Sequence, residues 1–154
     1  MKYYYIEPEV AGSFGEQTIL DSSLHPPKVT NLHYFLEGWL GDVLLELFPC
    51  WIVTTSAMNE IRSNRLSGVT FSDVKVTVSD ELSERQPELK IPQFIWMKVH
   101  GTQGRDDFGI GKGFKKINGV QRFDPHQFIL VISQKALDLL QRLGISHATI
   151  EDFP

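Results

Sequence analysis

The sequence predicts an α+β fold in which residues 1–154 form a single domain with a mixed β-sheet and two main helices. The chain has 154 residues, 42% of them hydrophobic, and a chain of this size can bury a core without disulfides or metals. Apolar residues recur at helical spacing in two main segments, whereas short β-branched or aromatic segments occur along the whole chain. Together these observations predict helices that pack against a sheet.

The two helical segments share one pattern. In IVTTSAMNEI (52–61) and VISQKALDLL (131–140), an apolar strand is followed by a Thr or Ser and then by Ala and a large apolar residue. The Thr or Ser hydroxyl can accept from a free amide of the first helical turn, and Gly68 or Gly144 can end the element. Both segments therefore predict strand–helix–strand units that bury their helix stripes against a shared sheet. The alternative is chance convergence of helix-capping chemistry.

The other elements follow from the β-forming residues and from the positions of Gly and Pro. Strands are predicted at 2–6, 29–36, 50–53, 69–78, 94–99, 128–132 and 148–150, and a short helix at 80–85. The apolar segment 43–48 is too short for its pattern to distinguish a strand from a helix. Residues 7–27 and 101–127 are rich in Gly or Pro and predict two long loops, the second with room for a short hairpin.

Composition excludes several classes of protein. Lys and Arg total 15 and Asp and Glu total 19, a net charge of −4, which disfavours a general nucleic-acid binder because phosphate contacts need surplus cations. The lone Cys50 excludes an intrachain disulfide. There is no apolar run of about 20 residues, the length that a membrane span needs, and no signal-peptide pattern. A cytoplasmic protein is expected.

The net charge is concentrated in the first third of the chain. Residues 1–50 contain 2 lysines against 7 acidic residues, whereas the rest of the chain is nearly balanced. One interpretation is an ordinary solvated surface. The other is an acidic face that attracts a basic partner.

Patterns that would indicate an enzyme or a metal site are weak. The five histidines show no metal-binding spacing, and Cys50 lies in apolar sequence, where burial would make the thiol inert. The segment 109–116 is rich in Gly and Lys, but Asp106 and Gly113 occupy positions where a phosphate-binding loop needs Gly and Ser or Thr. We therefore expect no catalytic residue, no metal and no cofactor. The basic segment is either a solvated hairpin tip or a partner-binding loop.

Two further features allow a structural and a functional interpretation. Trp39 lies between glycines, so it either plugs the core or forms an exposed interface anchor. Asp106 and Asp107 are either turn formers or a carboxylate pair for acid–base work, although adjacent side chains on a strand point apart.

Several segments together resemble a family. They are YYYIEPEVAGSFGE (3–16), GWLGDVLLELFPCWIVT (38–54), DDFGI (106–110) and VISQKALDLLQRLGISHATIEDF (131–153). Their order and spacing resemble small immunity proteins of bacterial polymorphic-toxin and contact-dependent growth inhibition systems. The resemblance covers about residues 1–54 and 94–154 and implies a cytoplasmic, non-enzymatic protein that binds and neutralises the C-terminal domain of a cognate toxin.

The acidic first third is compatible with a basic toxin domain. The predicted toxin-contacting residues are Glu7, Glu9, Glu16, Glu37, Trp39, Asp42, Asp106 and Asp107. Two other functions stay open: a small-molecule-binding or enzymatic domain with residues 101–127 as a lid, and a homodimer formed through a sheet edge or the region of Trp39.

Overall fold

The computed structural model describes residues 1–24, 27–117 and 120–154, with the side chains of 112–128 left out of the description. This part of the chain is α+β, with three helices, two of them main, and thirteen strands in four sheets. The predicted class and the two main helices are confirmed. The prediction of a single mixed sheet is wrong, since the strands divide among several sheets.

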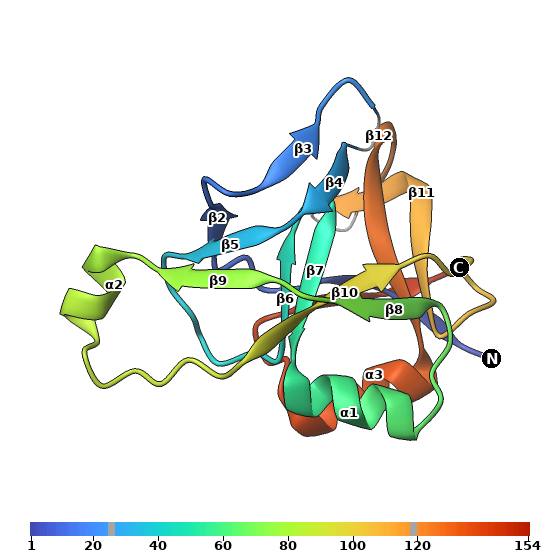
Figure 1. Ribbon diagram of the computed structural model, residues 1–154. Helices are drawn as coiled ribbons and strands as arrows, with labels where there is room; N and C mark the ends of the chain where they lie inside the picture. Colours follow the sequence, from blue (N-terminus) through green and yellow to red (C-terminus); the bar gives the residue numbers. More distant parts are fainter. Residues whose placement is uncertain (25–26, 118–119) are drawn as a thin grey trace.

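Two four-stranded antiparallel sheets form the centre of the molecule (Figure 1). The first has the order β6 (Leu44–Leu47), β7 (Cys50–Thr54), β10 (Phe94–Val99), β8 (Val69–Ser72), and the second β11 (Phe108–Ile117), β12 (Val120–Ser133), β1 (Tyr3–Glu7), β13 (Thr149–Phe153). A three-stranded sheet contains β2 (Gly12–Phe14), β5 (His33–Leu36) and β9 (Lys75–Val78), with β5 and β9 parallel. Strands β3 (Ile19–Asp21) and β4 (Lys28–Asn31) form a separate antiparallel pair.

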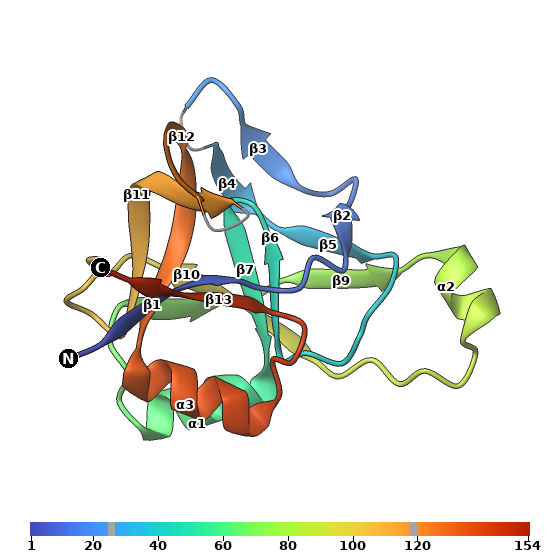
Figure 2. The same ribbon diagram turned by 180° about the vertical axis from the view of Figure 1, so that it is seen from behind.

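The two strand–helix–strand units have the same topology. In the first unit, α1 (Thr55–Ser63) joins β7 to β8, and in the second, α3 (Gln134–Leu143) joins β12 to β13. In each, the two strands lie parallel on either side of an intervening antiparallel strand, which is β10 in the first unit and β1 in the second. The units do not share a sheet because each has its own intervening strand. They share a core instead, with α1 and α3 side by side in both views (Figures 1 and 2).

The helix caps agree with the sequence at the start of both helices. The Thr54 hydroxyl accepts from the Ala57 amide at 3.2 Å, and the Ser133 hydroxyl accepts from the Ala136 amide at 3.1 Å. Helix α3 ends at Gly144 as predicted, where the backbone takes a φ of 120°. These ends are set by local chemistry, which the sequence displays directly.

Helix α1 ends earlier than predicted. It stops at Ser63, where the Asn64 side chain donates to the Glu60 carbonyl, instead of continuing to Gly68. Gly68 lies beyond the helix, where its φ is 97° and a Cβ would lie 2.0 Å from the Phe108 carbonyl oxygen. The glycine is therefore required by the close approach of the two units.

Four other segments differ from the sequence prediction. Residues 7–27 contain β2 and β3 instead of one loop, and residues 29–36 divide between β4 and β5. Residues 69–78 form two strands in different sheets, and residues 101–127 are mostly β11 and β12. Strands β2, β5, β8 and β9 are decided by pairing with strands from other parts of the chain, which local propensity does not contain. The pairs β3–β4 and β11–β12 instead join strands that follow one another in the chain. The expected role of 101–127 as a lid concerns side chains that lie largely outside those described.

The sheet of β6, β7, β10 and β8 separates two apolar clusters. Along β7, Trp51 and Val53 enter the cluster beneath α1 and α3, whereas Cys50 and Ile52 enter the cluster on the other face. The short helix α2 (Asp80–Arg85), which matches its predicted range, contributes Leu82 to that second cluster. None of the helices in the described residues has the length and apolar character needed to cross a membrane.

Candidate functional site

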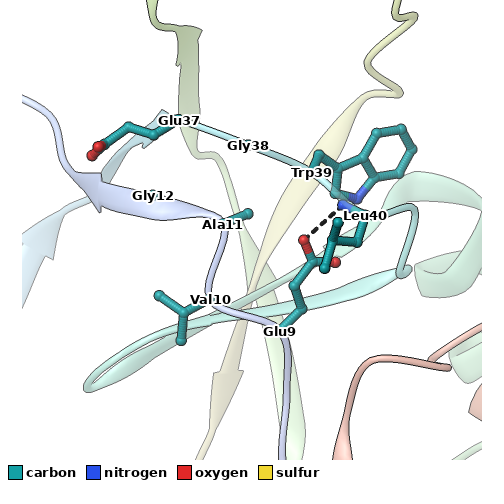
Figure 3. Close-up of a pocket in the computed structure, with 8 residues that line it drawn as sticks. All are labelled: Glu9, Val10, Ala11, Gly12, Glu37, Gly38, Trp39 and Leu40. Atoms are coloured by element: carbon teal, nitrogen blue, oxygen red, sulfur yellow. Dashed lines mark hydrogen bonds between the residues drawn. The ribbon is translucent and has the colours of Figure 1, made fainter. Parts of the chain in front are cut away.

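A surface hollow lies where the segment after β1 passes the segment after β5. Its volume is about 330 Å³, and its lining consists of Glu9, Val10, Ala11, Gly12, Glu37, Gly38, Trp39 and Leu40 (Figure 3). The backbone holds the two segments together, because the Glu37 and Gly38 amides both donate to the Ala11 carbonyl, at 2.8 and 3.1 Å. A bulkier residue at Gly12 is excluded, since its Cβ would lie 1.8 Å from the Phe35 carbonyl oxygen.

The buried Tyr34 fixes one of the two segments that line the hollow. Its hydroxyl accepts from the Ala11 amide at 2.9 Å and donates to the Glu46 carbonyl at 3.0 Å. Burial raises the pKa of this hydroxyl to about 12. The phenol is therefore neutral at physiological pH and acts as a fixed hydrogen-bonding bridge between β5, β6 and the segment that lines the hollow.

The rim of the hollow combines apolar and acidic side chains. Val10 is 60% exposed and Leu40 is 64% exposed. Glu37 is exposed as well, and the Ser13 hydroxyl donates to its carboxylate at 2.5 Å. Figure 3 shows the Glu37 side chain extending away from Trp39 and Leu40. Exposed apolar residues beside a charged group are typical of a protein-contacting surface.

Trp39 forms one wall and is partly buried. Its ring packs edge-on against Phe94 with a centroid distance of 6.1 Å, and its indole N–H donates to the Asp42 carbonyl at 3.0 Å. The interpretation of Trp39 as a core plug is therefore confirmed for most of its surface. Its ring also fixes the loop that presents Leu40.

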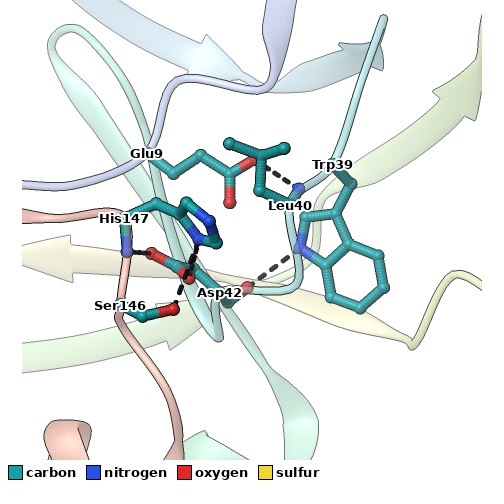
Figure 4. A network of polar contacts seen from close by, with 6 residues as sticks. All are labelled: Glu9, Trp39, Leu40, Asp42, Ser146 and His147. Atoms are coloured by element: carbon teal, nitrogen blue, oxygen red, sulfur yellow. Dashed lines mark hydrogen bonds and ion pairs between the residues drawn. The ribbon is translucent and has the colours of Figure 1, made fainter.

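Behind the wall lies a polar cluster of Glu9, Asp42 and His147 (Figure 4). Asp42 Oδ1 lies 2.8 Å from His147 Nδ1, and Asp42 Oδ2 accepts from the His147 amide at 2.9 Å. Glu9 Oε2 accepts from the Leu40 amide at 2.8 Å. One potential ligand atom from each residue lies within 4.8 Å of the other two.

The eight predicted contact residues do not form one face. Glu9, Glu37 and Trp39 meet at the hollow, with Asp42 behind them, but Glu9 and Asp42 are only 7% and 1% exposed. These two buried carboxylates cannot belong to an exposed acidic face, and that part of the prediction is corrected. Glu16 is exposed beyond β2, and Glu7 ends β1 beside Thr149.

Of the two remaining acids, Asp106 is a turn former, whereas Asp107 joins distant segments of the chain. The Asp106 carboxylate accepts from the Thr102 amide at 2.7 Å. The Asp107 carboxylate accepts from the Ser67 amide at 2.9 Å and from the Ser133 hydroxyl at 2.7 Å. Asp107 thereby ties the connection between α1 and β8 in the first unit to the helix cap of the second.

Three residues at this site lie outside the predicted set. Val10 and Leu40 are apolar residues in segments predicted to be loop or turn, and an exposed apolar residue in such a segment is a signal that the charge count ignores. His147 is 105 positions from Asp42 in the chain, so no local spacing joins them.

Cys50 does not offer nucleophilic chemistry. Its side chain is buried, and burial raises the pKa of the thiol to about 12. The thiol is therefore protonated at neutral pH and packs as a small apolar group, as the sequence predicts.

Comparison of the chain with protein-family models, curated proteins and solved structures yields no match.

Proposed function

We propose that this protein is a non-enzymatic immunity protein that binds and neutralises the C-terminal domain of a cognate bacterial toxin in the cytoplasm. The proposal begins from the sequence resemblance described above. The structural observation that supports it is the hollow whose rim carries the exposed Val10 and Leu40 and whose lining includes the exposed Glu37.

The proposed contact surface consists of Val10, Glu37 and Leu40, with Trp39 as its rigid support. The two apolar side chains would be desolvated at the centre of an interface, where a few such residues supply most of the binding energy. The Glu37 carboxylate would attract a basic partner and orient it during encounter. The hydrogen bonds of Trp39 and the backbone pairing with Ala11 hold the surface in place before binding, which lowers the entropic cost of association.

The test is co-expression with the toxin domain encoded beside the gene of this protein. We expect the toxin domain alone to arrest growth, and the wild-type protein to restore growth and to co-elute with the toxin domain in size-exclusion chromatography. A toxin domain that still arrests growth in the presence of this protein, and that elutes separately from it, would contradict the proposed function.

The surface is tested separately with charge and apolar variants. Glu37→Lys is expected to slow association and to weaken its salt dependence, and Leu40→Ala to weaken binding by about tenfold to a hundredfold. Asp138→Lys, on the exposed side of α3, makes the same change in net charge away from the hollow and serves as the control. Equal binding by Glu37→Lys, Leu40→Ala and wild type would show that another surface meets the toxin.

A further inference from the structure

Three segments that are distant in the chain meet at the cluster of Glu9, Asp42 and His147. Glu9 follows β1, Asp42 precedes β6, and His147 lies between α3 and β13 (Figure 4). The Val43 amide also donates to the Gly144 carbonyl at 2.9 Å, so the backbone brings the second and third segments together independently of the three side chains.

One buried oxygen in this cluster lacks a partner. Glu9 is 7% exposed, and its Oε1 forms no hydrogen bond in the described structure, although Oε2 accepts from the Leu40 amide. Figure 4 shows the oxygen without a dashed line on the side that faces His147 and Asp42. A buried carboxylate oxygen without a donor is costly, so such a group in a native protein indicates a missing ion, proton or water.

The cluster also contains more acidic than basic groups. It holds two carboxylates, 7% and 1% exposed, against a single imidazole. Lys2 and Arg142 pair with Asp152 and Glu60, and within the described part of the chain the side chain that contacts the Asp42 carboxylate is the His147 imidazole. Two buried carboxylates beside one imidazole are the arrangement that a divalent cation stabilises, because the ion neutralises both charges.

We propose that Glu9, Asp42 and His147 form a binding site for a divalent transition-metal cation, with Zn²⁺ as the preferred ion. Carboxylate oxygen and imidazole nitrogen are both common zinc ligands, and three protein ligands leave a position for water. The ligand set does not suit Ca²⁺, which takes six to eight oxygens, or Mg²⁺, which prefers oxygen ligands and several waters. The imidazole nitrogen is the group that favours Zn²⁺ over these ions.

The geometry allows such a site after some movement. In tetrahedral coordination with bonds of about 2.0–2.2 Å, ligand atoms are about 3.3–3.6 Å apart. The ligand atoms of the three residues lie within 4.8 Å of one another, so the widest separation has to close by at most about 1.5 Å. His147 can supply that movement, because its side chain is 41% exposed and lies in a loop.

Metal binding at this position would join the N-terminal and C-terminal segments of the chain. The ion would link the segment that lines the hollow, through Glu9, to the loop after α3, through His147. This inference goes beyond the proposed function and does not depend on it, since the site is measured without any toxin.

The first experiment is a zinc titration of the full chain, purified without a histidine tag and freed of metal with a chelator. Competition with a chromophoric zinc chelator is expected to give one Zn²⁺ per chain, and Mg²⁺ and Ca²⁺ are expected not to compete. At a free zinc concentration about one hundred times the Kd, binding to the folded state should raise Tm by about 5–10 °C.

The variants separate this site from adventitious binding. Glu9→Gln and His147→Ala are each expected to weaken zinc binding at least tenfold, whereas His100→Ala, which removes an exposed imidazole elsewhere, should change it less than twofold. Glu9→Gln keeps an oxygen that can accept from the Leu40 amide, so it is the variant expected to stay folded. No binding, binding unchanged by Glu9→Gln and His147→Ala, or equal loss in His100→Ala would each overturn the proposal.

Discussion

The two strand–helix–strand units have the same topology, but their helices are buried to different extents. Helix α3 buries Ala136, Leu137, Leu139 and Leu140, whereas α1 buries only Ala57 and Ile61. When the repeats are aligned through Thr54 and Ser133, each buried position of α1 has a buried counterpart in α3. The converse fails at two positions, since Met58, opposite Leu137, is only partly buried and Glu60 stands opposite Leu139. A repeated topology therefore does not impose a repeated apolar stripe, because each helix adapts to its own neighbours.

Exchange of the side-chain types at the position of Glu60 and Leu139 should give the largest difference between the units. Leu139→Glu places a carboxylate in the core and is expected to lower the free energy of unfolding by more than about 4 kcal/mol. Glu60→Leu removes only an exposed ion pair with Arg142 and should change the free energy of unfolding by less than about 1 kcal/mol. Urea denaturation measures both, and similar losses in the two variants would contradict the different burial of the helices.

Truncation at the shared position should affect both units alike. Ile61 and Leu140 occupy equivalent places and are essentially fully buried. Ile61→Ala and Leu140→Ala are each expected to cost about 2–5 kcal/mol, since a cavity adds to the lost burial. Thermal and urea denaturation give the comparison, with the exposed Lys135→Ala as the control. A cost below about 1 kcal/mol in either unit would show that its helix does not contribute to the common core.

The two helix caps should differ in a smaller but measurable way. Thr54→Ala removes one capping bond and is expected to cost about 1 kcal/mol. Ser133→Ala removes the cap and also the donor to Asp107, so a loss of about 2–3 kcal/mol is expected. Denaturation of Thr54→Ala, Ser133→Ala, Asp107→Ala and the Ser133→Ala/Asp107→Ala double variant separates the cost of the lost cap from that of the lost link. If Ser133→Ala costs the same with and without Asp107→Ala, the link between the units does not contribute to stability.

The smallest effect on stability at neutral pH is expected from replacing Cys50, which stands opposite Ile129 in the repeat alignment. Burial raises the pKa of the folded thiol to about 12, above its ordinary value of 9.0. The neutral thiol therefore makes its full contribution to the free energy of unfolding below about pH 9. This contribution is lost as the pH rises from 9 toward 12. Cys50→Val should match the wild-type slope of stability against pH below pH 8 and decline less steeply above pH 9. Parallel curves from pH 7 to 11 would contradict a buried, protonated thiol.

The features of the fold that depend on neighbouring residues in the chain can be predicted from the sequence. The caps at Thr54 and Ser133 and the end of α3 at Gly144 follow from contacts within a few residues, and these predictions are confirmed. The division into several sheets depends on the insertion of β1 between β12 and β13 and of β10 between β7 and β8, and each inserted strand comes from outside the strand–helix–strand unit that it completes. Pairing of that kind is a property of the whole chain, so periodicity predicts the units and cannot predict which strand enters each one.

The same distinction holds at the candidate site. Glu37 and Trp39 are predicted from charge and turn chemistry, and both line the hollow. Asp42 is predicted as one acid among several, but its burial and its bond to His147 arise only when the C-terminal loop folds back on the start of β6. A charge count treats buried and exposed acids alike, and for that reason it groups Asp42 with Glu16.

The position of β1 has a consequence during synthesis. This strand leaves the ribosome well before its two partners, β12 and β13, which come from residues 120–153. At about 5–20 residues per second, translation needs on the order of ten seconds to reach them. Throughout that interval both edges of the nascent tyrosine-rich strand lack their native partners, which leaves the strand open to pairing with another chain. The sheet of β6, β7, β10 and β8, whose strands all lie between residues 44 and 99, can assemble well before the second sheet is complete.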